Sequence, residues 1–222
     1  MESRSATIPA SLLLLGTLYG GMVTIAGVLG AKQVAMGPLA VEAGIFPFLL
    51  LVGISSGVTR LYGAQVGQRL VRLGFIPLVM AIVLTLFVLQ LPTDPGMYPP
   101  AKEAFPIILG QSWRLMLAGI VAYGVSVTLN VSVFAWIVAR LQAWPGTAGF
   151  IAAALSQIVD TFLFITIAFV GVRPVAELYA GQMIAKVVLS AVMVPLVIRL
   201  VLWIGARIDG HEISAAKSGD DS

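Results

Sequence analysis

The chain contains no cysteine and a single histidine, His211, which lies in a polar stretch near its end. Without cysteine it can form no disulfide, no thiolate nucleophile and no cysteine metal site. A zinc hydrolase or a Ser-His-Asp triad also lacks its histidines. No phosphate-binding Gly-x-x-x-x-Gly-Lys motif occurs, so the chain itself should not hydrolyse ATP. We therefore expect no enzymatic activity, no metal ion and no cofactor.

Charged residues are also scarce. They make up 10% of the 222 residues, whereas hydrophobic residues make up 59%. A soluble domain has about 25% charged and about 45–50% apolar residues. The composition therefore indicates an integral membrane protein, and the net charge of +3 requires no nucleic-acid partner. Only helices or a closed barrel can span a bilayer, and long uninterrupted apolar runs favour helices.

Six apolar runs are long enough to span a membrane. The first run exceeds the 7–15 apolar residues of a signal peptide, so we interpret it as a span. The longest connector, residues 92–112, contains a short apolar patch at 105–109 for which we predict an interfacial helix. We predict an all-α fold with one six-helix transmembrane domain, residues 1–208, and a disordered polar tail, 209–222. The six runs cover about residues 10–31, 41–59, 73–91, 113–138, 147–172 and 179–205.

Glycines recur along the first run, which predicts a small-residue face for close helix packing. Between the second and third runs, residues 60–72 form a basic stretch that we interpret as a connector. The glycines are Gly16, Gly20, Gly21, Gly27 and Gly30.

The distribution of lysine and arginine predicts the orientation. Six spans place the leader, the second and fourth connectors and the tail on one side of the membrane. That side holds eight basic residues and the other side holds four. Because cytoplasmic loops carry the excess of Lys and Arg, we predict that both termini are cytoplasmic. The eight are Arg4, Arg60, Arg69, Arg72, Arg140, Arg199, Arg207 and Lys217, and the four are Lys32, Lys102, Arg114 and Arg173.

Asp160 lies near the middle of the fifth run. A carboxylate at the membrane centre costs about 2.5–3.5 kcal/mol on insertion scales, so by default it marks a functional site. Gln157, Asp160, Thr161 and Phe164 are spaced i, i+3, i+4 and i+7, which places them on one helix face. We predict that this face turns away from lipid. The alternative is a purely structural carboxylate paired with a neighbouring helix.

Lys186 is the one lysine within a predicted span, and we predict that it pairs with Asp160. The alternative is that its side chain extends to the outer surface. Gln182 and Ser190 lie four residues to either side of Lys186, on the same helix face. Polar stripes on the fifth and sixth spans together predict a shared, water-accessible cavity.

Other polar residues have weaker signals. Asn130 is polar at depth in the fourth span, and Tyr123 and Ser126 lie on nearly the same face, which fits either a site or interhelical hydrogen bonds. Arg60 is either a site residue or a positive-inside anchor, and we favour the anchor. Glu42 is interpreted as a residue of the outer interface.

The run Ser156-Gln157-x-x-Asp160-Thr161-x-x-Phe164 resembles the signature of the queuosine precursor transporters, the VUT family of six-helix inner-membrane proteins. Weaker pieces occur in the expected order along most of the chain. In place of the family's acidic residue late in the second helix, this chain has serines. The weaker pieces are Phe46-Pro47-Phe48, Arg60 to Ala64, Ala104-Phe105, Leu109-Gly110, Trp113-Arg114, Ala122-Tyr123, Asn130, Val133-Phe134, Lys186 and Pro195, and the serines are Ser55 and Ser56.

The resemblance implies a multi-pass importer of 7-deazaguanines, such as 7-cyano-7-deazaguanine, in the cell inner membrane. Asp160 and Gln157 would then bind the polar edge of the base, while Phe164, Tyr123 or Phe134 would stack on its face. The implied substrate-binding set also includes Lys186, Asn130, Ser56 and Arg60. A substrate-binding subunit of a multi-subunit ATP-driven vitamin importer is the alternative. The expected partners are a small purine-like molecule and membrane lipid, with a homo-oligomer left open.

The orientation can be tested with single cysteines, because the chain has none of its own. We expect an impermeant thiol reagent to label a cysteine at Lys102 in intact cells, and to leave a cysteine at Ser218 unlabelled. Labelling at 218 but not at 102 would contradict cytoplasmic termini.

Overall fold

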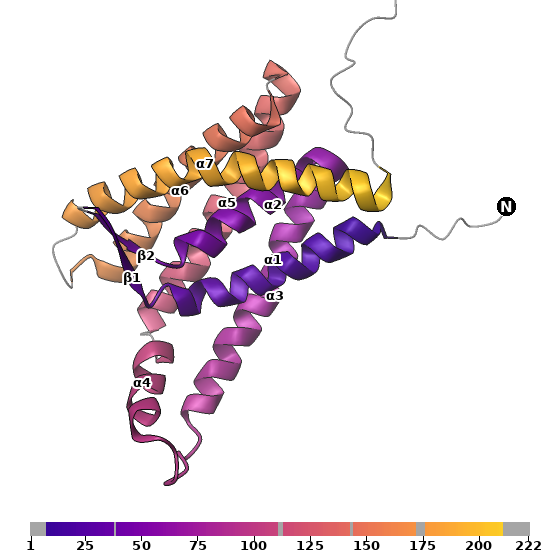
Figure 1. Ribbon diagram of the computed structural model, residues 1–222. Coiled ribbons are helices and arrows are strands. Elements are labelled where there is room, and N and C mark those ends of the chain that lie inside the picture. The colour runs from indigo at the N-terminus through magenta and orange to yellow at the C-terminus, as the bar shows by residue number, and fades with distance from the viewer. Residues whose placement is uncertain (1–7, 38, 111–112, 143, 172–175, 211–222) are drawn as a thin grey trace, which may run out of the picture.

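The computed structural model describes residues 8–37, 39–110, 113–142, 144–171 and 176–210 (Figure 1). Within these ranges the chain forms seven helices, six of which are long and apolar enough to cross a membrane. The six predicted spans are thereby confirmed. The helices are α1 (Ala10–Leu29), α2 (Ile45–Tyr62), α3 (Ala64–Leu89), α4 (Pro99–Leu109), α5 (Trp113–Leu141), α6 (Pro145–Phe169) and α7 (Ala176–Asp209).

The turn between α2 and α3 is much shorter than predicted. A single residue, Gly63, joins the two helices, and its φ of 88° is in the region that favours glycine. The basic stretch 60–72 is therefore mostly helix, with Arg69 and Arg72 inside α3. The reversal brings α2 and α3 close together at once, since a Cβ on Gly67 would lie 2.1 Å from Thr59 Oγ1.

A short β-hairpin, which the sequence analysis did not predict, connects α1 to α2. Strands β1 (Gln33–Met36) and β2 (Leu39–Glu42) pair antiparallel, with Gln33 opposite Glu42. Gly37, with a φ of 61°, lies at the turn. The hairpin delays the start of α2 from the predicted residue 41 to Ile45. It also fixes Glu42 at the entrance to the helix bundle.

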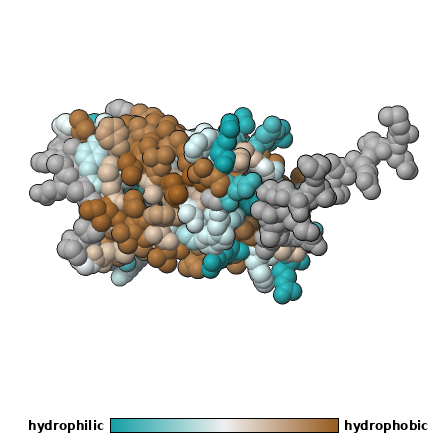
Figure 2. Space-filling view, turned by 90° about the horizontal axis from the view of Figure 1, so that it is seen from above, coloured by the Kyte–Doolittle hydropathy of each residue, from teal (hydrophilic) through white to brown (hydrophobic). Residues whose placement is uncertain are grey.

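The second half of α3 and the whole of α4 project from the rest of the bundle (Figure 1). Only three residues of α3 are buried, Gly67, Val71 and Gly74, and all lie in its first half. The predicted helix at 105–109 exists but is longer, beginning at Pro99. Figure 2 shows hydrophobic residues over the middle of one face and hydrophilic residues gathered toward the end where α7 finishes, as expected for a membrane protein.

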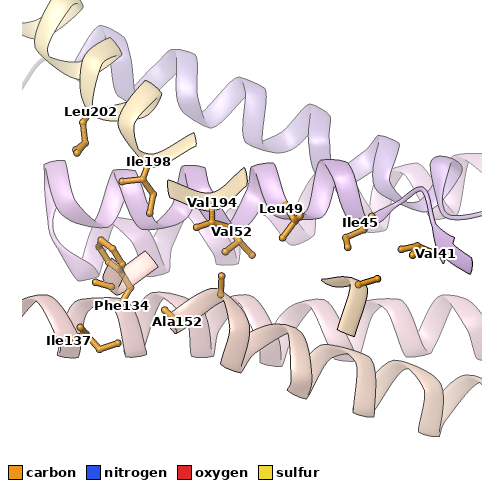
Figure 3. Packing of buried hydrophobic residues seen from close by; sticks show 13 residues of the cluster. Val41, Ile45, Leu49, Val52, Phe134, Ile137, Ala152, Val194, Ile198 and Leu202 are labelled. Carbon is orange, nitrogen blue, oxygen red and sulfur yellow. The ribbon is translucent and has the colours of Figure 1, made fainter. Parts of the chain in front are cut away.

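Helix α2 lies at the centre of the core. Its apolar side chains form one hydrophobic cluster with residues of α5, α6 and α7, shown in Figure 3. Gly53 and Gly57 permit a close approach to α7, because a Cβ on either would lie about 2.5 Å from Val197 or Val201. The predicted small-residue face on α1 is wrong. An added Cβ on Gly21 or Gly27 would meet no atom within 4 Å, and one on Gly20 would lie at an ordinary 3.6 Å from Pro77. The buried residues of α1 are instead Ser11, Leu15, Tyr19 and Val23.

Three helix ends meet at one end of the bundle. The Ser11 hydroxyl of α1 and the Tyr62 hydroxyl of α2 both donate to Asp209 Oδ2 of α7, over 2.6 and 2.7 Å. Asp209 was assigned to the polar tail, and this was wrong, because it ends α7 and joins these helices. The remainder of the predicted tail, from residue 211, lies outside the described residues. The first and last helices therefore start and finish on the same side, as an even number of spans requires.

The packing of α2 on α7 predicts a difference between two glycines. Gly57→Ala should lower the free energy of unfolding by about 1–3 kcal/mol, since the added methyl overlaps Val201. Gly21→Ala should leave it unchanged or raise it by up to about 1 kcal/mol, because alanine favours helix and the site is open. Thermal unfolding in detergent measures both. Equal stability of the two variants would contradict the close α2–α7 contact.

Candidate functional site

A cavity of about 500 Å³ lies between the helices at the hairpin end of α2. All the described helices and both strands contribute lining residues. Four predicted site residues reach it, namely Asp160, Lys186, Tyr123 and Phe164. The volume is within the range of about 300–1,000 Å³ that small-molecule sites occupy. The structure thus brings four of the nine predicted site residues together around one space.

An ion pair forms part of the cavity wall. Lys186 Nζ of α7 lies 3.0 Å from Asp160 Oδ2 of α6. The two residues are only 8% and 6% exposed. Each charge would be costly alone in such a setting, and each neutralises the other. The predicted pairing is confirmed, and the alternative in which Lys186 extends to the outer surface is wrong.

The second oxygen of the carboxylate is also occupied. Ser126 Oγ of α5 donates to Asp160 Oδ1 over 3.2 Å. Asp160 therefore joins three helices, and both its oxygens are hydrogen-bonded to neighbouring side chains. These two contacts hold the carboxylate in place on the cavity wall. An ionised carboxylate can accept further charge-assisted hydrogen bonds from a ligand.

Aromatic rings form a second part of the wall. The Tyr123 hydroxyl contacts the Tyr19 hydroxyl at 2.9 Å and donates to Val71 O at 3.3 Å, so its ring is held in place. Phe164 is half-buried and meets Phe169 edge to face at 6.1 Å. Both phenylalanines line the cavity. These rings offer flat apolar surfaces beside the ion pair.

Glu42 lines the same cavity, contrary to its interpretation as an outer-interface residue. It is half-buried, and Gln182 Nε2 donates to its Oε1 over 3.4 Å. Gln182 lies one turn before Lys186 on α7, as the predicted polar stripe requires. Among the described residues, the cavity is therefore lined by two acidic groups and one basic group. No sequence signal located Glu42, because its position depends on the hairpin.

The other five predicted residues are not among those that line this cavity. Asn130 and Ser56 are fully buried and bonded to each other, with 3.0 Å between Asn130 Nδ2 and Ser56 Oγ. Gln157 is fully buried, and neither polar atom of its side chain has a partner among the described residues. A separate, smaller cavity near the other end of α2 is lined by Arg60 and by Phe134, the third predicted stacking ring.

The sequence analysis also missed a structural role for Arg114. From the start of α5 its guanidinium donates to Ile167 O and Val170 O, which are carbonyls at the end of α6. A cation is favourable there, because the last carbonyls of a helix lack partners within it. The contact fixes the end of α6, and with it Phe169, beside the cavity. The sequence analysis used Arg114 for the orientation and for the resemblance, but an arginine at the start of a span did not indicate which carbonyls it would contact.

A family model described as "Putative vitamin uptake transporter" matches residues 42–200, well over half of the chain. The chain belongs to this family. The predicted resemblance to the VUT family is therefore confirmed. No curated protein and no solved structure matches the chain.

Membership of the VUT family identifies the chain as a multi-pass membrane protein with a transport role and a small-molecule substrate. The matched range includes Glu42, Asp160 and Lys186, the three charged residues that line the large cavity. It leaves out α1, which supplies one apolar wall.

The ion pair predicts a specific pattern of stabilities. Lys186→Met should lower the free energy of unfolding by about 3 kcal/mol or more, because Asp160 is left as a buried unpaired charge. Combining it with Asp160→Asn should be less destabilising than the sum of the two single changes. A double-mutant cycle on thermal unfolding in detergent measures this. A coupling energy within about 0.5 kcal/mol of zero would mean that the residues act independently.

Proposed function

We propose that this VUT family member imports a 7-deazaguanine, such as the queuosine precursor 7-cyano-7-deazaguanine, across the cell inner membrane. The observation that carries the proposal is the Asp160–Lys186 ion pair on the wall of a large cavity, next to Phe164. A buried pair of opposite charges beside an aromatic ring matches the chemistry of a guanine-like base.

The site residues match both the polar edge and the flat face of such a base. A guanine-like edge offers two adjacent N–H donors, and a carboxylate is the side-chain group that accepts from both. The same edge carries a carbonyl oxygen, which an ammonium such as that of Lys186 satisfies. The flat face of the base stacks on an aromatic side chain, as in recognition of unpaired bases, and Phe164 supplies that ring. Asp160, Lys186 and Phe164 thus address the donors, the acceptor and the face of one ligand.

Binding in this scheme is an exchange of partners. Without ligand, Asp160 and Lys186 neutralise each other. A ligand with both donors and an acceptor enters between them and takes over both contacts, so neither charge is left unpaired. A purely apolar ligand cannot do so and would separate the charges without compensation. This exchange favours polar heterocycles over lipids that could also enter the cavity.

The predicted orientation supports import. The large cavity lies at the hairpin end of the bundle, together with α4, opposite the joined ends of α1 and α7. If the termini are cytoplasmic, this cavity faces the outside. It is then the place where an imported substrate is first bound.

The alternative function, a binding subunit of an ATP-driven importer, shares the binding site but not the transport step. Purified protein reconstituted alone into liposomes separates the two. Uptake of 7-cyano-7-deazaguanine by the chain alone supports the importer. Binding without uptake supports the subunit.

Asp160→Asn should weaken binding of 7-cyano-7-deazaguanine to the purified protein by roughly 30-fold to 150-fold. The amide keeps one acceptor and adds a mismatched donor, and losing a charge-assisted hydrogen bond costs about 2–3 kcal/mol. Asp94→Asn, in an exposed loop, is the matched control and should bind normally. Adenine, which lacks the two adjacent donors, should bind weakly to the unaltered chain. Normal binding by a folded Asp160→Asn protein would remove Asp160 from the site.

A further inference from the structure

A second cavity, of about 270 Å³, lies near the opposite end of α2. Arg60 and Thr59 of α2, Ala64 of α3 and four residues of α5 line it. The large cavity contacts the first turns of α2, from Gly44 to Leu51, whereas the small one begins at Thr59. The two cavities therefore lie at opposite ends of one central helix. The α5 residues are Phe134, Ala135, Val138 and Ala139.

Buried polar side chains occupy the region between the two cavities. From the large cavity, Asp160 contacts Ser126 on α5. One turn further along α5, Asn130 Nδ2 donates to Ser56 Oγ of α2 over 3.0 Å. Thr59, which lines the small cavity, lies a further three residues along α2. We call these residues, together with Gln157 and Thr161 on the same face of α6 as Asp160, the polar seam. They follow one another at intervals of about one turn on α5, α2 and α6.

The seam has more hydrogen-bonding capacity than its own contacts use. Asn130 Oδ1, Thr161 Oγ1 and both polar atoms of Gln157 are buried and have no partner among the described residues. All three residues are fully buried. A buried polar atom without a partner is destabilising, so apolar residues of similar shape would pack more stably here. Polar groups that remain here although they are destabilising point to a polar ligand that passes along the seam.

Phe134 is the large apolar residue that follows the seam on α5, and it belongs to the core cluster of α2, α5, α6 and α7. It is fully buried, lies one turn after Asn130 on α5 and borders the small cavity. Figure 3 shows its ring between α2 and α5, near Ile137 and far from Val41 at the hairpin end. Beyond it, the guanidinium of Arg60 presents several donors and a flat surface on which a planar heterocycle can stack. Along α5, Phe134 thus comes between Asn130 and the other residues that line the small cavity.

We propose that the small cavity is the far mouth of the transport route, that the polar seam is the route itself, and that Phe134 is the barrier across it. Arg60 then receives the leaving substrate, a planar polar heterocycle, on the opposite side of the membrane from Asp160. This inference rests on the proposed function for the direction of transport. The connection between the two cavities does not depend on which substrate is carried.

Access to the small cavity is tested with single cysteines on adjacent residues of α5. Ala135→Cys lines the cavity, whereas Trp136→Cys is its matched control, on the outer face of the helix. A hydrophilic thiosulfonate is applied from the side that holds the end of α7. The reagent should modify Ala135→Cys at least about tenfold faster than Trp136→Cys, because a thiol that faces lipid stays un-ionised and unreactive. Equal rates would overturn the assignment of the small cavity as a mouth.

The barrier is tested with a cysteine in the large cavity. Gly119 lines that cavity, and an added Cβ there meets no atom within 4 Å. Applied from the α7-end side, the reagent should reach Gly119→Cys slowly, and Phe134→Ala should raise the rate at least about tenfold by opening the seam. Phe87→Ala, on an exposed phenylalanine of α3, should not change it.

Phe134→Leu keeps the experiment decisive if Phe134→Ala fails to fold, since the smaller loss of volume should give a smaller but measurable increase. An unchanged rate in a folded Phe134 variant would mean that the ring is ordinary core packing, and the proposal would be wrong. These rates require no substrate. Their failure is therefore distinguishable from a failure of 7-cyano-7-deazaguanine to bind.

Discussion

The burial of two opposite charges in a membrane domain constrains the rest of this structure. Asp160 and Lys186 lie on different helices, and neither charge is tolerable alone away from water. Helices α6 and α7 must therefore meet with these faces inward and at matching depth. The bond from Ser126 brings α5 into the same arrangement. With the polar faces turned in, the opposite face of α6 carries exposed apolar residues such as Ile158 and Phe162, as contact with lipid requires.

Hydropathy predicts which segments cross the membrane, but it does not predict where each helix begins. Arg69 and Arg72 made the first turns of α3 resemble a connector, although the helix starts at Ala64. The single-residue turn at Gly63 depends on a positive φ that no apolar pattern reports. The hairpin was missed because its strands have four residues each, too few for a clear alternation. Asp209 looked like part of a tail until its partners on α1 and α2 were known.

The site was predictable where a residue was chemically out of place. A carboxylate and an ammonium are both rare within apolar runs, so each could be predicted as the partner of the other, and the structure pairs them. Periodicity also placed Gln157 on the inward face of α6, but it could not say that neighbouring helices cover it completely. Glu42 shows the opposite limit. It lies outside any helix, and only the register of the hairpin and its contact with Gln182 bring it to the cavity.

The walls of the large cavity are unequal, and this bears on what can bind there. Its three charged residues lie on β2, α6 and α7, whereas α3 and α4 contribute mainly apolar side chains such as Leu78, Ile82 and Ile107. A ligand with polar groups all around would leave some of them unpaired against the apolar wall, at a cost of several kcal/mol in the absence of water. A ligand without polar groups that separated the Asp160–Lys186 pair would offer neither residue a hydrogen bond in its place. A flat molecule whose hydrogen-bonding groups lie mainly on one edge satisfies both walls.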